Sequence, residues 1–232
     1  MRARTITIWF VMTGVLAGCA PEIDPSSEEV SSRDLRMNVA ASDEGSGATI
    51  EIQLDGILGP VRLSGGDALR VTMVGAAVPF GEVQGDRGIA YVAAIDALTE
   101  DLVVDLQRPN DRSATHTAEV PPPFTLTSAG ISGAAPLAMQ WDAAPGEHEL
   151  LLGVVGECIE PIARPLAQDT GAYAIGQAEL FHAGPGAAAT CPLTLTLTRT
   201  ATTQRDLNEG VVGGWFYARI VQSRAIEVSW SP

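Results

Sequence analysis

The stretch Leu193-Thr194-Leu195-Thr196-Leu197-Thr198 decides the fold class of this chain. Leucine and threonine alternate here with a strict period of two residues. Successive side chains of a β-strand point to opposite faces of the sheet, so the leucines share one face and the threonines the other. We therefore predict a strand whose leucine face is buried in an apolar core.

The same alternation recurs along most of the chain, and glycine-rich turns at 45–47, 65–67 and 85–88 separate the segments. The segment 91–107 also fits a helix, but the alternation within it and its β-branched residues favour two strands joined near 97–100. Further strands are predicted at 50–54, 69–73, 89–95, 102–106, 137–141, 150–154 and 226–230.

The N-terminus carries an export signal. Arg2 and Arg4 precede an apolar run over residues 5–15, which is too short to cross a bilayer core of about 30 Å. The run ends in Leu16-Ala17-Gly18-Cys19, which resembles the lipobox of bacterial lipoproteins. The resemblance implies that residues 1–18 are a signal peptide and that Cys19 becomes lipidated. An ordinary cleavable signal with a chance cysteine is the alternative.

The residues after Cys19 predict a tether and a location. Segment 19–34 is rich in proline, serine and acidic residues, and we expect it to form a disordered tether. Ala20 stands where an aspartate would retain a lipoprotein at the inner membrane, so the resemblance implies the outer membrane. The expected partners are the membrane, through the N-terminal lipid, and an envelope protein or glycan.

The chain is strongly acidic. It has 14 basic residues, all arginine, against 28 acidic ones, which gives a net charge of −14. Removal of the signal takes Arg2 and Arg4 with it and makes the charge −16. Such a surface repels nucleic acid, so we expect no nucleic-acid partner. The acidity supplies solubility, and calcium or a basic partner are the alternatives that it leaves open.

Two cysteines, Cys158 and Cys191, lie in the body of the chain. Cys191 shares the parity of the inward leucines at 193–197, and Cys158 shares that of the apolar positions at 150–154. In an oxidising compartment two such residues pair, so we expect a buried disulfide. The inward Trp141 beside it is typical of an immunoglobulin-like sandwich, although here the tryptophan precedes both cysteines.

The domain boundary is predicted at 120–123. Pro121-Pro122-Pro123 interrupts the alternation, because proline has no N–H to donate to a sheet. The sequence thus predicts an all-β fold with two tandem Ig-like antiparallel β-sandwich domains at 35–119 and 124–232.

The body also resembles a mostly uncharacterised group of two-domain β-sandwich lipoproteins from high-GC, myxobacterial-type genomes. The resemblance implies a fold and an envelope location but no activity. It is carried by Leu63-Ser64-Gly65-Gly66-Asp67, Pro123-Phe124-Thr125-Leu126-Thr127-Ser128, Trp141-Asp142, Gly156-Glu157-Cys158-Ile159, Asp169-Thr170-Gly171 and Cys191 with the Leu-Thr repeat up to Arg199.

Motifs that would carry catalysis are missing from the sequence. His116, His148 and His182 do not lie at metal-ligand spacing, and no G-x-S-x-G elbow or Gly-Lys phosphate loop occurs. We expect no enzyme and no cofactor. Calcium is the alternative, because oxygen ligands suit it and several acids lie in turns, although no D-x-D-x-D run is present. These acids are Asp43, Glu44, Asp55, Asp67, Asp86, Asp96, Glu100, Asp111 and Asp169.

One aromatic cluster, Trp215-Phe216-Tyr217, is a candidate binding surface. In a strand these neighbours alternate between faces, so an exposed ring could stack on a sugar or bind a partner. We favour the structural interpretation, in which both faces of this strand are buried. We expect a lipid-anchored, non-catalytic envelope protein with a binding or structural role. The alternatives are an exported hydrolase that acts on polysaccharide and a calcium-dependent adhesion module.

Overall fold

The computed structural model describes residues 25–85, 88–129, 131–132, 135–180, 191–207 and 214–231. The predicted signal peptide and Cys19 lie outside these residues. Within the described ranges, no helix has the length and apolar character needed to cross a membrane.

The regular secondary structure of the described chain is almost entirely β-strand, as predicted. In the first half the strands are β1 (Arg36–Asp43), β2 (Ala48–Gly56), β3 (Gly59–Pro60), β4 (Ala68–Met73), β5 (Ala76–Val78), β6 (Gly81–Gly85), β7 (Gly88–Ile95), β8 (Leu102–Gln107) and β9 (Ala114–Ala118). In the second half they are β10 (Leu126–Ser128), β11 (Ile131–Ser132), β12 (Leu137–Trp141), β13 (Glu149–Gly156), β14 (Ile162–Leu166), β15 (Ala172–Ile175), β16 (Cys191–Asp206) and β17 (Trp215–Ser231). Two 3-10 turns complete the elements, η1 (Ser27–Glu29) and η2 (Gln177–Glu179).

Each segment predicted from alternation lies within one of these strands. The segment 91–107 forms two strands rather than a helix, because β7 ends at Ile95 and β8 begins at Leu102. The alternation was therefore a reliable guide to local structure.

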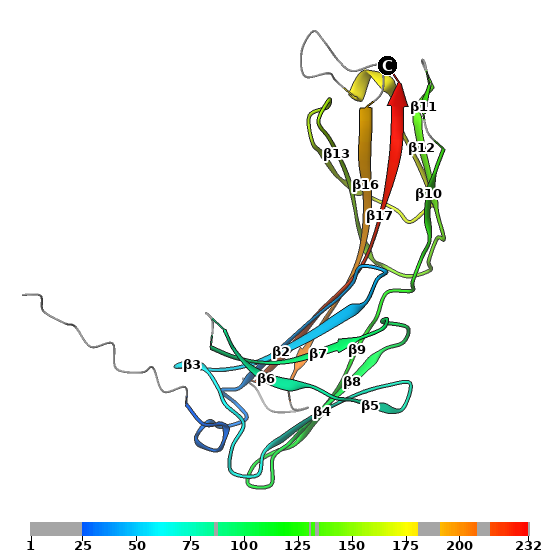
Figure 1. Cartoon of the computed structure of the whole chain (residues 1–232). Helices are drawn as coiled ribbons and strands as arrows, with labels where there is room; N and C mark the ends of the chain where they lie inside the picture. The colour runs from blue at the N-terminus through cyan, green and yellow to red at the C-terminus, as the bar shows by residue number, and fades with distance from the viewer. Residues whose placement is uncertain are drawn as a thin grey trace, which may run out of the picture.

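Three sheets make up the fold (Figure 1). The main sheet has ten strands in the order β14-β13-β16-β17-β1-β2-β7-β6, with β11 added to β17 and β3 added to β2. A four-stranded sheet, β5-β4-β8-β9, and a three-stranded sheet, β10-β12-β15, complete it. The pairs are antiparallel except that β17 runs parallel to both β1 and β11.

Two hydrophobic cores lie between these sheets. The first core contains residues of β1, β2, β4, β7, β8 and β9, with Leu35 and Val61 also buried in it. The second contains Leu137, Met139 and Trp141 of β12 packed with residues of β13 and with the leucines at 193–197. Each core is thus formed where the apolar faces of two sheets meet.

The two cores are not tandem domains of the predicted kind, because β16 and β17 run through both (Figure 1). The leucines at 193–197 belong to the second core, whereas Leu207, Phe216, Ala218 and Ile220 belong to the first. Residues that the sequence assigned to a domain at 124–232 therefore complete the core at 35–120. Local alternation shows which face of a strand is buried, but not which core buries it.

The predicted disulfide is present. Cys158 and Cys191 are bonded, with their Cα atoms 6.2 Å apart. Cys191 points into the second core as its parity predicted. Cys158 reaches the bond differently from the expectation, because β13 ends at Gly156 and the cysteine lies in the turn that follows.

The predicted tether is ordered over 25–34, which corrects the expectation of disorder for that part of 19–34. The buried Arg108 guanidinium donates hydrogen bonds to the carbonyl oxygens of Ser27 and Val30 and, at 2.9 Å, to the Ser32 hydroxyl. It also forms an ion pair of 2.9 Å with Asp67. Composition alone missed this segment, because buried polar contacts rather than apolar area hold it in place.

Arg199 joins the linker to the second core. Its guanidinium is fully buried and donates bonds of 2.7 Å to the Pro122 carbonyl, the Asp142 carbonyl and the Asp169 carboxylate. The guanidinium also lies 4.8 Å from the centre of the Phe124 ring. One charged side chain thus ties the linker to two loops and to strand β16.

Replacement of this side chain tests its structural importance. The variant R199M keeps the volume but leaves the Asp169 carboxylate buried without its partner, so the free energy of unfolding should fall by about 3 kcal/mol or more. The exposed Arg205 supplies the control, since R205M should change the free energy of unfolding by less than about 0.5 kcal/mol. Urea unfolding with the disulfide intact measures both. Equal stability of R199M and wild type would contradict the role assigned to Arg199.

Candidate functional site

Strand β17 divides the aromatic cluster between its two faces. Trp215 and Tyr217 are 44% and 37% exposed, whereas Phe216 is completely buried. The Phe216 ring stacks on His116 in the first core, with ring centres 4.5 Å apart. The surface candidate is therefore the pair Trp215 and Tyr217, and Phe216 supports it from beneath.

Strand pairing places other side chains beside these two rings. Partners in adjacent strands share a face, so the register defines rows across the main sheet. We call this solvent-facing surface the outer face. Its rows are Asp206, Trp215, Arg36 and Asp55; then Gln204, Tyr217, Asn38, Gln53, Ala90 and Val83; then Thr202, Arg219, Ala40, Glu51, Val92 and Gly81.

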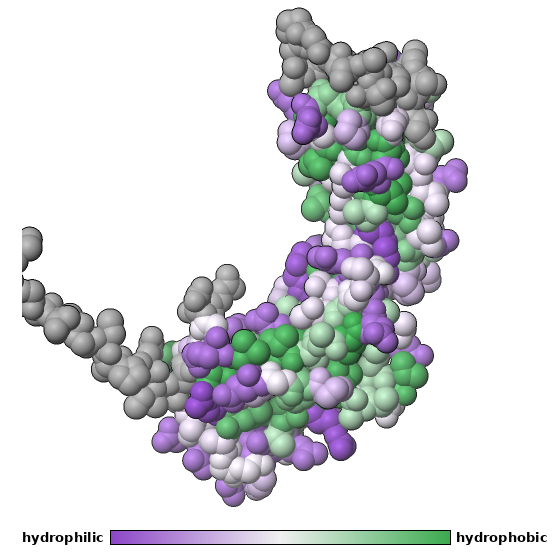
Figure 2. Space-filling view, in the orientation of Figure 1, coloured by the Kyte–Doolittle hydropathy of each residue, from purple (hydrophilic) through white to green (hydrophobic). Residues whose placement is uncertain are grey.

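The outer face is rigid, because the opposite face of the same strands is buried. Met37, Val39, Ile50 and Ile52 lie on that inner side and are at most 2% exposed. Figure 2 shows hydrophobic and hydrophilic residues side by side over the lobe that contains β2, β6 and β7. The backbone of a surface supported in this way needs no ordering on binding.

The middle row combines an aromatic ring with three amides. Gln204 on β16 and Asn38 on β1 pair with Tyr217 from either side. Gln53 on β2 pairs with Asn38 and extends the row. The Asn38 amide donates a 2.7 Å hydrogen bond to Asp55, which fixes its orientation. Amides both donate and accept hydrogen bonds, so this row can match the hydroxyl groups of a ligand that lies across it.

A shallow trough extends the outer face toward the sheet edge. It has a volume of about 370 Å³, and small residues on β7, Gly88 and Ala90, contribute to its lining. Glu51, Gln53 and Val83 also line it. The trough and the aromatic pair therefore belong to one continuous surface.

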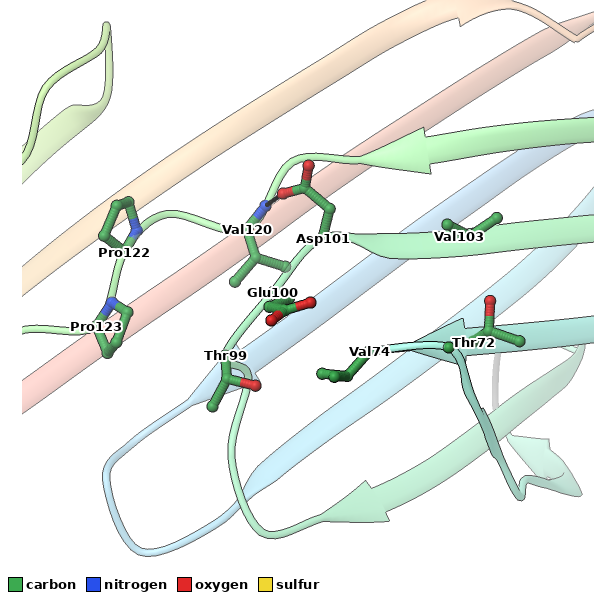
Figure 3. Close-up of a pocket in the computed structure, with 10 residues that line it drawn as sticks. Thr72, Val74, Thr99, Glu100, Asp101, Val103, Val120, Pro122 and Pro123 are labelled. Carbon is green, nitrogen blue, oxygen red and sulfur yellow. Dashed lines mark hydrogen bonds between the residues drawn. The ribbon is translucent and has the colours of Figure 1, made fainter.

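A second, larger groove lies near the linker (Figure 3). It has a volume of about 800 Å³ and lies between the turn at Val74-Gly75, the segment 99–101 and the prolines at 122–123. Val74 adopts a φ of 54°, a left-handed conformation that β-branched residues rarely take. Together with Gly75 at φ 73°, it forms the tight connection from β4 to β5.

The lining of this groove contains two carboxylates, Asp101 and Glu100. Asp101 accepts a 2.9 Å hydrogen bond from the Val120 backbone N–H, as the dashed line in Figure 3 shows. We take the outer face as the candidate site, because it combines two exposed aromatic rings with a row of amides.

Three of the loop acids considered for calcium have structural roles. Asp43, Asp67 and Asp169 form ion pairs with Arg224, Arg108 and Arg199 at 3.0, 2.9 and 2.7 Å. Among the described residues, no group of three His, Cys, Asp or Glu side chains is placed to hold a metal ion. Asp86 lies outside the described residues.

The histidines are also separated. His116 is buried, and its Nε2 lies 2.6 Å from the Leu207 carbonyl oxygen. His148 is half-buried, and its buried Nδ1 has no hydrogen-bond partner among the described residues. His182 lies outside the described residues.

Sequence reasoning found the aromatic pair but missed the amides beside it. Gln204, Asn38 and Gln53 come from three distant parts of the chain, and no local pattern connects them. Their alignment depends on the register of β16, β17, β1 and β2. No protein-family model matches the chain, and no curated protein matches it.

The buried pair of Asp169 with Arg199 predicts a pH dependence of stability. Burial raises the pKa of Asp169, but hydrogen bonds from the Trp141 indole and the Ala144 backbone, with the charge of Arg199, outweigh it and hold the pKa below its ordinary value of 3.8. A carboxyl whose pKa is lowered by folding stabilises the folded state above that ordinary value and loses this effect as pH falls through the folded pKa.

The variant D169N should therefore be less stable than wild type at neutral pH, and the difference should shrink below pH 3.8. Thermal unfolding across an acid pH series measures it. E179Q is the control, because the ion pair of Glu179 with Arg164 is exposed and solvent screens it. A difference between wild type and D169N that stays constant over the series would contradict the assignment.

Proposed function

We propose that this chain is a lipid-anchored, non-catalytic protein of the bacterial cell envelope. Its outer face binds an uncharged glycan. The observation that carries the proposal is the pair of exposed rings, Trp215 and Tyr217, on a rigid strand beside a row of amides. The lipobox-like residues at 16–19 support the anchor.

The chemistry of the outer face matches that of a sugar. The C–H faces of a pyranose ring are apolar and stack on aromatic rings, while its hydroxyl groups need donors and acceptors. Trp215 and Tyr217 are two residues apart on one strand, so their Cα atoms are about 6.6 Å apart. This spacing lets two rings contact successive units of one glycan chain, with Gln204 and Asn38 within reach of the hydroxyls.

The charge of the outer face favours an uncharged glycan. Arg36 and Arg219 are interspersed with Glu51, Asp55 and Asp206, so no side of the face is uniformly positive. The whole chain carries a net charge of −14, which repels acidic polysaccharides at a distance. A neutral polymer needs no uniformly positive surface and is not repelled by the net negative charge of the chain.

Metabolic labelling tests the anchor. Radioactive palmitate should enter the wild-type protein and not the C19A variant, because the thiol of Cys19 is the expected site of lipid attachment. The control C158A lacks a cysteine of the disulfide and should still be labelled. Equal labelling of wild type and C19A would refute the anchor.

Binding to insoluble neutral glycans tests the outer face. We expect the wild-type protein to bind at least one member of a panel of cellulose, chitin and mixed glucans. Each ring contributes about 1 kcal/mol of stacking, so W215A/Y217A should bind at least about tenfold more weakly. L151A, which trims an exposed leucine on β13, is the control and should bind like wild type.

The outcome is read from pull-down isotherms at equal protein concentration. No wild-type binding to any neutral glycan of the panel, or equal binding by W215A/Y217A, would refute the glycan-binding role. Neither result would affect the labelling of Cys19.

A further inference from the structure

Two large aliphatic side chains project from the turn between β2 and β3. Ile57 is 77% exposed and Leu58 is 90% exposed. Tight turns usually carry Gly, Asn, Asp, Ser or Pro, because these residues suit the backbone and tolerate solvent. Here glycines occupy only the flanking positions, Gly56 and Gly59, and the tip itself is apolar. Folding of the turn does not require these two side chains.

The tip is held firmly by the structure beneath it. Gly56 pairs with Gly59, and Asp55 pairs with Pro60. Methyl groups of Val61 and Val30 lie 3.2 and 3.4 Å from the position that a Cβ of Gly56 would occupy. Val61 is fully buried in the first core. The two aliphatic side chains are therefore presented on a supported hairpin.

The described chain begins beside this hairpin. The Ser27 N–H donates a 2.7 Å bond to the Arg62 carbonyl, and the Arg62 N–H donates a 3.0 Å bond to the Pro25 carbonyl. Figure 1 shows β3 next to the first coloured residues of the chain. Cys19 lies six residues before Pro25. Six residues span at most about 20 Å, so a lipid on Cys19 would keep this end of the molecule at the membrane.

Resting on the proposed lipid anchor, we infer that the Ile57-Leu58 tip inserts into the interface of the same bilayer and orients the protein on it. The occupant is zwitterionic phospholipid, because the acidic chain repels anionic head groups. Two aliphatic side chains bury little area, so the tip orients a molecule that the lipid already holds.

Insertion of the tip would place the outer face close to the membrane. The row that contains Trp215 continues through Arg36 and Asp55, and Asp55 pairs with Pro60 beside the hairpin. A glycan held by Trp215 and Tyr217 would then lie near the bilayer surface rather than at the far end of the molecule.

Photo-crosslinking tests the inference. The full chain, purified with its lipid, is bound to phosphatidylcholine vesicles that contain a diazirine-bearing phosphatidylcholine, irradiated, and digested with trypsin. The chain has no lysine, so cleavage at arginine puts the tip in peptide 37–62, Val74 in peptide 71–87 and Trp215 in peptide 206–219. We expect cross-links at Ile57 and Leu58, and none at Val74, which is a 61% exposed aliphatic residue at another turn.

Matched variants separate the tip from the rest of the surface. I57N/L58N should lose the cross-links, whereas V74N should retain them. If the protein is recovered without lipid, Cys19 is coupled to vesicles that carry a maleimide lipid, since Cys158 and Cys191 are bonded to each other and Cys19 is the remaining thiol. The tip is then tested even when acylation has failed.

Cross-links at Val74 or Trp215 in place of 57–58, or equal labelling of wild type and I57N/L58N, would overturn the inference. Vesicle-bound protein with no cross-link to peptide 37–62 would overturn it too, while leaving the anchor intact. Absence of lipid on Cys19 together with cross-links at the tip in the coupled sample would refute the anchor and support the tip.

Discussion

The ladder between β16 and β17 is the constraint on which the rest of the structure depends. It runs from Cys191 opposite Trp230 to Asp206 opposite Trp215, and it contributes apolar side chains to both cores. Because the two strands are paired along this whole length, the two cores share one sheet. The outer face exists only because β17 continues from the second core to pair with β1.

Two buried arginines and one half-buried arginine connect the loops to this framework. Arg108, Arg199 and Arg224 each form an ion pair with an aspartate and donate to at least one backbone carbonyl. A guanidinium has five N–H donors, so one side chain can satisfy several buried acceptors at once. Such clusters explain why acids in turns, which also suit calcium, here serve the fold.

The features with proposed roles, namely the N-terminal anchor, the Ile57-Leu58 tip and the outer face, are all associated with the first lobe. The chain enters it beside the Ile57-Leu58 tip, and the outer face extends from the same end of the sheet. The proposed anchor, orienting contact and glycan-binding face form a consistent arrangement, because the start of the described chain, the tip and the outer face lie at one end of the main sheet. The second lobe extends away from this end (Figure 1).

The sequence by itself determined the pairing of Cys158 with Cys191, because these are the two cysteines in the body of the chain. It also determined the strands and their buried faces. These follow from the two-residue period of a strand, which is a local property. Only the tertiary structure decided that residues 207–220 complete the first core, that Arg108 orders residues 25–34 and that Gln204, Asn38 and Gln53 line up beside Tyr217. Register and burial depend on contacts between residues far apart in the chain, and a local period contains no information about which strands meet.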